Sequence, residues 1–296
     1  MAELEIFAKE VGDAGPVVCV GGRTQWDVGG APDSGAREVS APAGVVTFEP
    51  AEMTVRVRAG TTAAELDAVL AEGGQMVVLD PADPERATVG GVLAVGHSGL
   101  RRLRYGPVRD TVLEVRFVSS EGKLVKAGGP VVKNVSGFDL CRLLVGSLGT
   151  LGFIGEVVLR TLPRPAVSQW FAGHGDPLEV RRRLFRPSCL LWDGDRMWAL
   201  LEGRAPDVEQ EARALGAEFS PIDGPPKLPE HRRGTRPLAL LSALSPGEVA
   251  EVGVGTIHTP QPQPAPQLEG SVLDLNQRVK AQFDPTGRLN PGRMVT

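Results

Sequence analysis

Short apolar runs alternate with glycine turns through the first 165 residues of the 296-residue chain. Apolar residues recur at alternate positions between Val45 and Ala59, which predicts strands with one buried face. A capping box at Thr62-Ala63-Ala64-Glu65 begins a helix, and Gly73-Gly74 ends it. This mixture of strands and helices predicts an α+β domain over residues 1–165.

The second half of this domain contains a predicted hairpin, a short helix and a strand. Val112–Val118 and Lys123–Ala127 flank a polar turn, which predicts the hairpin. The helix is expected over Phe138–Val145 and the strand over Leu151–Leu162. Pro163-Arg164-Pro165 then ends the domain.

The pattern restarts in residues 166–258, which we expect to form a second, small domain. The expected elements are a strand at 167–172, a helix at 177–185, strands at 189–192 and 197–201, and a helix at 207–215. Asp193-Gly194 lies between the last two strands and is a strong hairpin signal. This β-α-β-β-α order is most of a ferredoxin-like unit.

The end of the chain combines a linker with a helix. Four prolines at alternate positions predict an extended linker over residues 259–270. Ser271 is expected to cap a final helix, in which Val272, Leu275 and Val279 recur at helical spacing. Residues 271–296 should thus form a helix and a turn that return to the first domain.

Composition narrows the class of protein. A net charge of −4 and an isoelectric point near 5.7 argue against nucleic-acid binding, which usually needs a basic face. The three cysteines are widely spaced, so neither a disulfide framework nor a metal site is expected. The apolar runs are too short for a transmembrane segment, and no secretory signal is evident. We therefore expect a cytoplasmic protein, with any membrane association arising through partner subunits.

Two glycine-rich segments carry the candidate chemistry. Thr88, Gly90 and Gly91 begin a predicted glycine-rich loop that continues to Gly99, and an earlier turn, Gly21–Gln25, follows a short apolar strand. Glycines let the backbone approach a ligand closely and expose N–H groups to it, as in several folds that bind a pyrophosphate. Two such sites suit a dinucleotide better than a single phosphate. Packing alone remains the alternative explanation.

These motifs resemble the FAD-binding domain shared by vanillyl-alcohol oxidase and p-cresol methylhydroxylase. The segments Lys133–Pro165 and Phe283–Met294 are similar to one branch of that family, the FAD-binding subunits of bacterial glycolate oxidase. The resemblance covers roughly the first 165 and the last 25 residues. It implies a two-subdomain FAD-binding domain of this type with a reduced ferredoxin-like cap.

The resemblance also implies the residues that bind FAD. The pyrophosphate would lie against Gly21, Gly22, Arg23, Thr24 and Gln25. The ribityl chain and flavin ring would contact Thr88, Gly90, Gly91, Ala94 and Gly99, with Pro81 and Ser98 nearby. The backbone of Gly152, Ile154 and Glu156 would lie by the adenine. No histidine or cysteine occupies a position where relatives tether flavin, so non-covalent FAD is expected.

Four further features stay open. His97 is either a base or an ordinary surface residue, and His174-Gly175-Asp176 is either the remnant of a substrate motif or a loop with a helix cap. Lys133–Asp139 leads into a helix N-terminus and suits anion or ribose contacts. Arg101, Arg102 and Arg104 steer a 2-hydroxy acid, bind a partner or are solvated.

The resemblance implies the FAD-binding subunit of a glycolate (2-hydroxy acid) oxidase or dehydrogenase complex. Relatives of this kind work beside a catalytic flavin subunit and an iron–sulfur subunit, and three scattered cysteines cannot hold a cluster here. No convergent His–Arg pair is evident within residues 167–255, so no catalytic residue is assigned. The alternatives are a self-sufficient flavin oxidoreductase for another small substrate and a scaffold subunit that has lost FAD.

Overall fold

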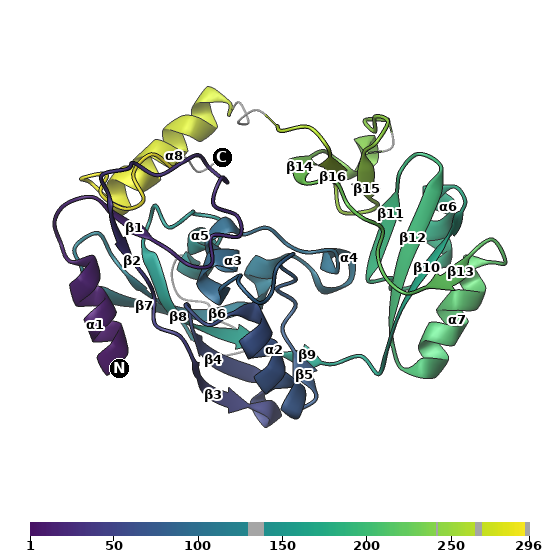
Figure 1. Cartoon of the computed structure of the whole chain (residues 1–296), viewed down its shortest axis with the longest axis horizontal. Coiled ribbons are helices and arrows are strands. Elements are labelled where there is room, and N and C mark those ends of the chain that lie inside the picture. The colour runs from purple at the N-terminus through teal and green to yellow at the C-terminus, as the bar shows by residue number, and fades with distance from the viewer. Residues whose placement is uncertain (130–138, 241, 264–267, 294–296) are drawn as a thin grey trace. The chain divides into compact units, whose positions relative to one another are not determined.

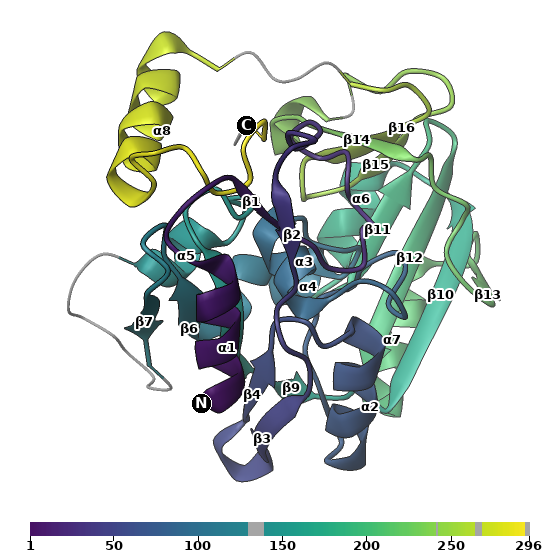
Figure 2. The same ribbon diagram turned by 60° about the vertical axis from the view of Figure 1, so that its left-hand side comes forward.

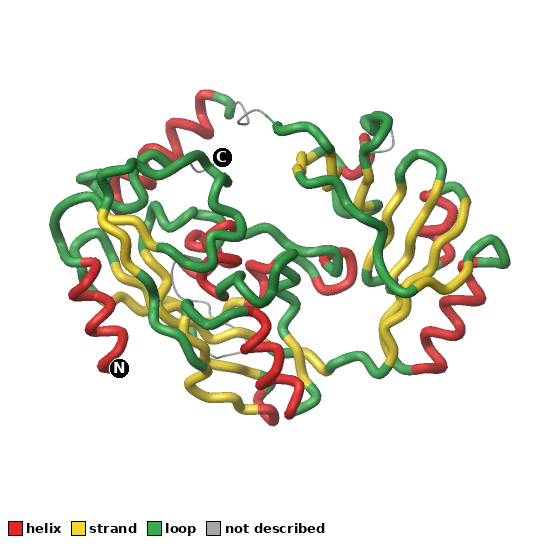
Figure 3. The backbone as a smooth tube through the Cα atoms, in the orientation of Figure 1, coloured by secondary structure: helices red, strands yellow, loops and turns green. Residues whose placement is uncertain are grey.

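The computed structural model describes residues 1–129, 139–240, 242–263 and 268–293. The chain divides into two compact units, whose elements are labelled in Figure 1. Unit 1 comprises Met1–Gly99, Pro107–Arg164 and residues 265–296, whereas unit 2 comprises Leu100–Gly106 and Pro165–Pro264. Both units mix helices with strands (Figure 3), which confirms the expected α+β class.

Unit 1 is built on a five-stranded antiparallel sheet of order β3-β4-β8-β6-β7. Its strands are β3 (Val45–Glu49), β4 (Thr54–Arg58), β6 (Val112–Val118), β7 (Leu124–Gly128) and β8 (Phe153–Arg160). Side chains alternate across the sheet, so Val55 and Val57 enter the apolar core while Arg56 projects from the opposite face. The predicted strands and hairpin are confirmed.

Three helices supply the rest of the unit 1 core. They are α2 (Ala63–Glu72), α3 (Val89–Val95) and α5 (Leu140–Leu144), and each buries apolar side chains in that core. The capping box of α2 is confirmed, because the Thr62 hydroxyl accepts from the Glu65 N–H at 3.1 Å and the Glu65 carboxylate accepts from the Thr62 N–H at 2.9 Å.

The opposite face of the five-stranded sheet is charged and buried. Glu114 and Glu156 are almost wholly inaccessible to solvent there. Arg56 lies 2.7 Å from Glu114 and 2.9 Å from Glu156, and Arg58 lies 2.5 Å from Glu156. The N-terminal helix α1 (Ala2–Val11) contacts β8 and is drawn beside the sheet in Figure 2. This helix was not predicted from the sequence.

The two ends of the chain meet in unit 1. β1 (Val17–Cys19) pairs in parallel with β2 (Arg37–Val39), and Leu289 forms a bridge to Val17. The buried Arg288 guanidinium donates to five backbone carbonyls, those of Val11, Gly12, Ala14, Gly15 and Ser120. The C-terminal turn is therefore an integral part of this unit.

The final helix differs from its prediction in two respects. α8 spans Gly270–Phe283, its N-cap is Glu269, and Ser271 lies inside the helix rather than capping it. Val272 and Leu275 are exposed, whereas Val279 and Phe283 pack partly against the unit 1 core. Among the described residues, no helix has both the length and the apolar character required to cross a membrane.

Unit 2 contains a seven-stranded sheet of order β13-β10-β12-β11-β15-β16-β14. Its strands are β10 (Val167–His174), β11 (Cys189–Trp192), β12 (Arg196–Gly203), β13 (Ser220–Ile222), β14 (His231–Gly234), β15 (Val249–Glu251) and β16 (Thr256–Thr259). The first four in sequence stand in the order fourth-first-third-second and, with α6 (Pro177–Arg183) and α7 (Ala205–Leu215), complete a ferredoxin-like unit. The hairpin across Asp193-Gly194 is confirmed.

Two features of unit 2 were not expected. Four strands, β13, β14, β15 and β16, were not among the predicted elements, and the last three enlarge the sheet beyond the ferredoxin-like unit. The segment Leu100–Gly106, with the short helix α4 (Arg102–Tyr105), also packs in unit 2, although we expected it in the first domain. The role of unit 2 as a cap remains a prediction.

The remaining short elements connect these parts. They are β5 (Gln75–Met76), which pairs with β9 (Leu162–Pro163), and the 3₁₀ turns η1 (Pro50–Glu52), η2 (Val108–Thr111) and η3 (Pro237–Ala239).

Candidate functional site

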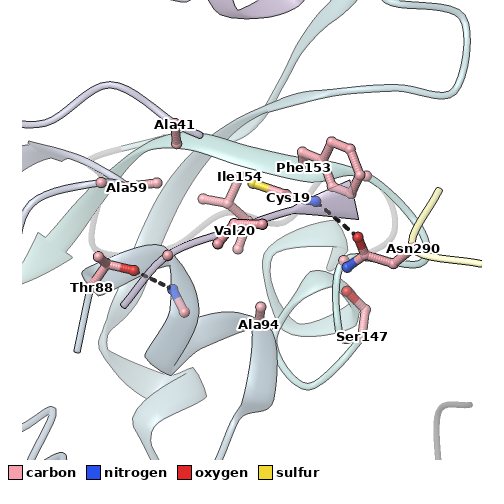
Figure 4. Close-up of a pocket in the computed structure, with 16 residues that line it drawn as sticks. Cys19, Val20, Ala41, Ala59, Thr88, Ala94, Ser147, Phe153, Ile154 and Asn290 are labelled. Carbon is pink, nitrogen blue, oxygen red and sulfur yellow. Dashed lines mark hydrogen bonds between the residues drawn. The ribbon is translucent and has the colours of Figure 1, made fainter. Parts of the chain in front are cut away.

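Two adjoining pockets lie in unit 1 where β1, α3 and the C-terminal turn meet. They contain about 490 and 570 Å³ of empty space, part of which is open solvent. Six residues line both pockets: Cys19, Gly21, Thr88, Gly91, Ala94 and Asn290. The pockets thus form one continuous cleft, part of which Figure 4 shows.

The Gly21–Gln25 turn forms one wall of the second pocket. Its five backbone N–H groups donate no hydrogen bond to any described residue. The side-chain oxygen Oε1 of Gln25 is buried and likewise has no hydrogen-bond partner in the described chain. Gly21, Arg23 and Thr24 are exposed, so the N–H groups of the turn are open to a polar ligand.

The charge beside this turn comes from two arginines that flank Trp26. The guanidinium carbons of Arg23 and Arg293 lie 4.8 and 4.6 Å from the centre of the Trp26 ring. Arg23 is already paired with Glu38 at 2.6 Å, while Arg293 donates to the carbonyls of Trp26 and Val28. Arg293 therefore fixes the end of the turn and leaves a cation at the pocket.

The Thr88–Gly99 segment is a helix at its start and not the loop we expected. Thr88 caps α3, and its hydroxyl accepts from the Gly91 N–H at 3.1 Å. The first two N–H groups of the helix donate to the carbonyls of Thr61 and Ala59. These donors are consequently committed to the protein, and a ligand here would meet the side of the helix.

Several glycines in this segment allow close packing of protein on protein. A Cβ at Gly90 would lie 2.8 Å from the Cβ of Ala59, and one at Gly99 would lie 2.0 Å from the Cβ of Asp80. Gly91 differs, because it is exposed and a Cβ there would meet only the Thr88 hydroxyl within 4 Å. The packing explanation therefore holds for part of the motif, and Gly91 is the position most open to a ligand.

Eleven of the fifteen predicted cofactor residues line the cleft. They are Gly21, Gly22, Arg23, Thr24, Gln25, Thr88, Gly90, Gly91, Ala94, Gly152 and Ile154. Pro81, Ser98, Gly99 and Glu156 do not line it. The Ser98 hydroxyl accepts from the Val108 N–H at 3.0 Å, and the Glu156 carboxylate belongs to the charged face of the sheet. The role of every one of these residues toward FAD remains a prediction.

Asn290 joins three segments around the cleft and was not identified from the sequence. Its Oδ1 accepts from the Cys19 N–H at 3.0 Å, and its Nδ2 donates to the Leu148 carbonyl at 2.5 Å (Figure 4 shows the first of these bonds). The left-handed backbone at Asn290, with φ 44°, suits asparagine better than most residues. Asn290 therefore ties the C-terminal turn to β1 and to the turn before β8.

Cys19 also lines both pockets and was not predicted to do so. Desolvation raises the pKa of its thiol to about 12, although a backbone hydrogen bond acts in the opposite direction. Because the thiolate is the nucleophilic form, Cys19 stays a thiol at neutral pH and is a poor site for a covalent tether.

The features left open from the sequence now have locations. His97 is exposed. Asp176 caps α6 by accepting hydrogen bonds of 2.9 Å from two backbone N–H groups, so the His174–Asp176 segment is a strand end followed by a helix cap. Residues 133–138 lie outside the described chain. Arg104 donates to the carbonyl of Glu202 within unit 2, so this arginine anchors its segment.

Comparisons with known proteins agree with the geometry of unit 1. Residues 3–128 match the family described as FAD binding domain. The fold resembles that of alkyldihydroxyacetonephosphate synthase, with a TM-score of 0.57, 19% identity, and coverage of 72% of this chain and 47% of that structure.

Similar sequences include two glycolate oxidase subunits. GlcE of Escherichia coli (strain K12) is 34% identical over 225 residues, which cover 73% of this chain and 64% of that protein. GlcD of Bacillus subtilis (strain 168) is 32% identical over 121 residues, which cover 41% of this chain and 26% of GlcD. D-lactate dehydrogenase of Archaeoglobus fulgidus is 40% identical over 106 residues, which cover 36% of this chain and 24% of that enzyme.

The chain thus spans less than two thirds of the length of these relatives. Similarity to GlcE extends well beyond the FAD-binding domain, whereas similarity to the other two is confined to about 40% of the chain. The match of residues 3–128, the GlcE similarity and the fold likeness agree with one another. The match of residues 3–128 places this part of the chain in the FAD-binding domain family.

Proposed function

We propose that the chain is an FAD-binding subunit of a glycolate oxidase-type complex. The observation that carries the proposal is the Gly21–Gln25 turn, whose five N–H groups lack protein partners within the matched domain. Backbone N–H groups directed at a pyrophosphate replace the hydration that its charged oxygens lose on binding. Arg293 adds a fixed cation beside them.

The two pockets of the cleft differ in the side chains that line them. The second pocket contains the turn, the arginines and Trp26, and suits the pyrophosphate. The first pocket is lined by Ala41, Ala59, Phe153 and Ile154 and suits an aromatic ring system. When bound, FAD would supply the capacity to accept a hydride, and the chain would hold and orient the cofactor.

The first test is the absorption spectrum of the purified full-length chain before and after incubation with FAD. We expect the protein to be yellow or to take up added FAD. We also expect unfolding to release all the flavin, because Cys19 remains protonated. A colourless protein that takes up no FAD would instead support the scaffold alternative, and flavin retained on the unfolded chain would contradict non-covalent binding.

The second part of the proposal concerns partners. The 34% identity with GlcE supports an accessory subunit that works in the cytoplasm beside a catalytic flavin subunit and an iron–sulfur subunit. The described chain offers no cluster of three or more metal-binding side chains, so an electron path through metal would run in another subunit.

We expect the purified chain alone to oxidise glycolate or lactate slowly or not at all. Hydride transfer needs the substrate fixed over the flavin. Such positioning can lower the activation barrier by roughly 7–11 kcal/mol. Steady-state assays with and without the two partner subunits measure this dependence. Turnover by the single chain at about 10 per second, a typical enzymatic rate, would instead support the self-sufficient oxidoreductase.

A further inference from the structure

Phe185 is the most exposed large apolar residue of the described chain. It lies in unit 2, shortly after the end of α6, and is 81% exposed. Single apolar residues on a surface are common, so exposure alone does not indicate binding. What distinguishes Phe185 is the backbone that holds it and the charge of its neighbours.

The backbone around Phe185 is fixed by side chains from two other helices. The Phe185 N–H donates to both carboxylate oxygens of Glu211 on α7, at 3.0 and 3.1 Å. The Arg186 carbonyl accepts from Arg104 of α4 at 3.4 Å, and the Leu184 side chain is buried in the unit 2 core. The exposed ring therefore has a preorganised support, which reduces the entropy that is lost when a partner binds.

Three arginines lie within three positions of Phe185. Arg182, Arg183 and Arg186 are all exposed, and together with Phe185 we call them the Phe185 patch. Arg182 is paired with Glu179 at 2.5 Å, whereas the other two arginines form no ion pair within the described chain. The patch is therefore basic, although the whole chain carries a net charge of −4. Its charge is complementary to an acidic surface, whose carboxylates would pair with the two free guanidinium groups.

A second copy of this chain does not fit the patch. A two-fold symmetric contact would bring the arginines of both copies into one interface, where like charges repel each other. An asymmetric contact would leave the patch of an outer copy free and would continue into an open chain of copies. The charge and symmetry arguments thus favour a different protein.

An anionic lipid surface also fits the patch less well than a protein does. Helices that lie on membranes bind through a broad apolar face, whereas α6 has seven residues and the patch offers one apolar ring. The carboxylates of Glu179 and Glu211 lie beside the patch and would be repelled by anionic lipids. Aromatic and arginine side chains are, in contrast, enriched in protein interfaces.

We propose that the Phe185 patch is the docking site for an acidic surface on a partner subunit. The Phe185 ring enters an apolar recess of that subunit, and Arg183 and Arg186 pair with carboxylates around the recess. The inference rests on the proposed function, because the patch is the surface through which a partner subunit of the proposed complex binds. It concerns unit 2 and requires nothing from the FAD cleft.

The test is co-expression of the tagged full-length chain with the catalytic flavin subunit and the iron–sulfur subunit, followed by affinity capture. The amount of partner captured per chain is compared between the unmodified chain, Phe185→Ser and a double variant with Arg183→Glu and Arg186→Glu. We expect each variant to lower this amount roughly tenfold or more, as removal of a central interface residue usually does. Ile6→Ser and Arg109→Glu are the matched controls, because they change an exposed apolar and an exposed basic residue of unit 1 and should leave capture unchanged.

Folding and FAD uptake are measured for every variant. All the substituted residues are exposed, so circular dichroism should show folded chains with equal FAD uptake. Capture that persists in the folded patch variants, or that falls equally in the controls, would overturn this proposal and leave the proposed function intact. Failure of the unmodified chain to capture either subunit would overturn both this proposal and the assignment of partners, while FAD uptake tests cofactor binding separately.

Two further measurements distinguish the other occupants. Sedimentation of the chain alone detects self-association, and flotation with vesicles that contain phosphatidylserine detects lipid binding. We expect neither. Self-association or vesicle binding that Phe185→Ser abolishes would overturn the proposal by assigning the patch to a second copy or to a membrane.

Discussion

Replacement of Gly22 by alanine is expected to lower the affinity of the chain for FAD by roughly a hundredfold or more, equivalent to about 2.7 kcal/mol. A Cβ built at this position would lie 1.7 Å from the carbonyl oxygen of Arg86, closer than any real contact. The Gly21–Gln25 turn would have to move away from the segment before α3. This movement would displace the N–H groups that line the pocket. Fluorescence titration with FAD measures the loss.

Gly35→Ala is the matched control for this experiment. A Cβ at Gly35 has no neighbour within 4 Å, so FAD affinity and melting temperature should both stay as in the unmodified chain. The Gly22 variant should stay folded, because the turn is at the surface and outside the apolar core. Unchanged FAD affinity in a folded Gly22→Ala chain would remove this turn from the site.

Local signals made the best predictions from the sequence. The capping box of α2 and the hairpin at Asp193-Gly194 were identified correctly because each depends on residues within a few positions of one another. The glycine turn after β1 was located for the same reason. In contrast, α3 was taken for a loop, because glycines at its second and third positions lower helix propensity and obscure the cap at Thr88.

Long-range contacts account for most of what the sequence did not reveal. Asn290 reaches Cys19 across 271 positions, and Arg293 reaches Trp26 across 267. Neither residue belongs to a local pattern that points to the cleft. The charged face of the five-stranded sheet was missed likewise, since Arg56, Glu114 and Glu156 come from three strands. The expected contact of the Glu156 backbone with adenine stays a prediction, and the Glu156 carboxylate is held by Arg58 and Arg56.

Unit 2 shows a related limit. Residues 167–255 contain no convergent His–Arg pair in sequence, but folding brings Arg232 and His258 together, and His258 lies just past that range. The need for partner subunits is therefore inferred from the similarity to GlcE and not from the lack of such a pair.

Replacement of Glu114 by glutamine is expected to destabilise the chain by about 3–5 kcal/mol at neutral pH, the usual cost of breaking one side of a buried ion pair. Glu114 is fully buried and accepts a hydrogen bond from Arg56 at 2.7 Å, with Lys126 at 3.1 Å from its second oxygen. The amide would leave both cations with less compensation. Urea unfolding at pH 7 followed by circular dichroism measures the free energy of unfolding.

The pH dependence of this loss distinguishes electrostatics from packing. Burial raises the pKa of Glu114, but the hydrogen bonds and charges of Arg56 and Lys126 outweigh it and hold the pKa below its ordinary value of about 4.3. A carboxylate with a depressed folded-state pKa stabilises the fold above its unfolded pKa and loses that contribution as the pH falls through the folded one. The difference in free energy of unfolding between the unmodified chain and the Glu114→Gln variant should therefore shrink below about pH 4.3. Glu121→Gln is the control, because Glu121 and Lys123 form a fully exposed pair, and it should change stability little at any pH. A loss of stability in Glu114→Gln that does not vary with pH would instead be due to packing.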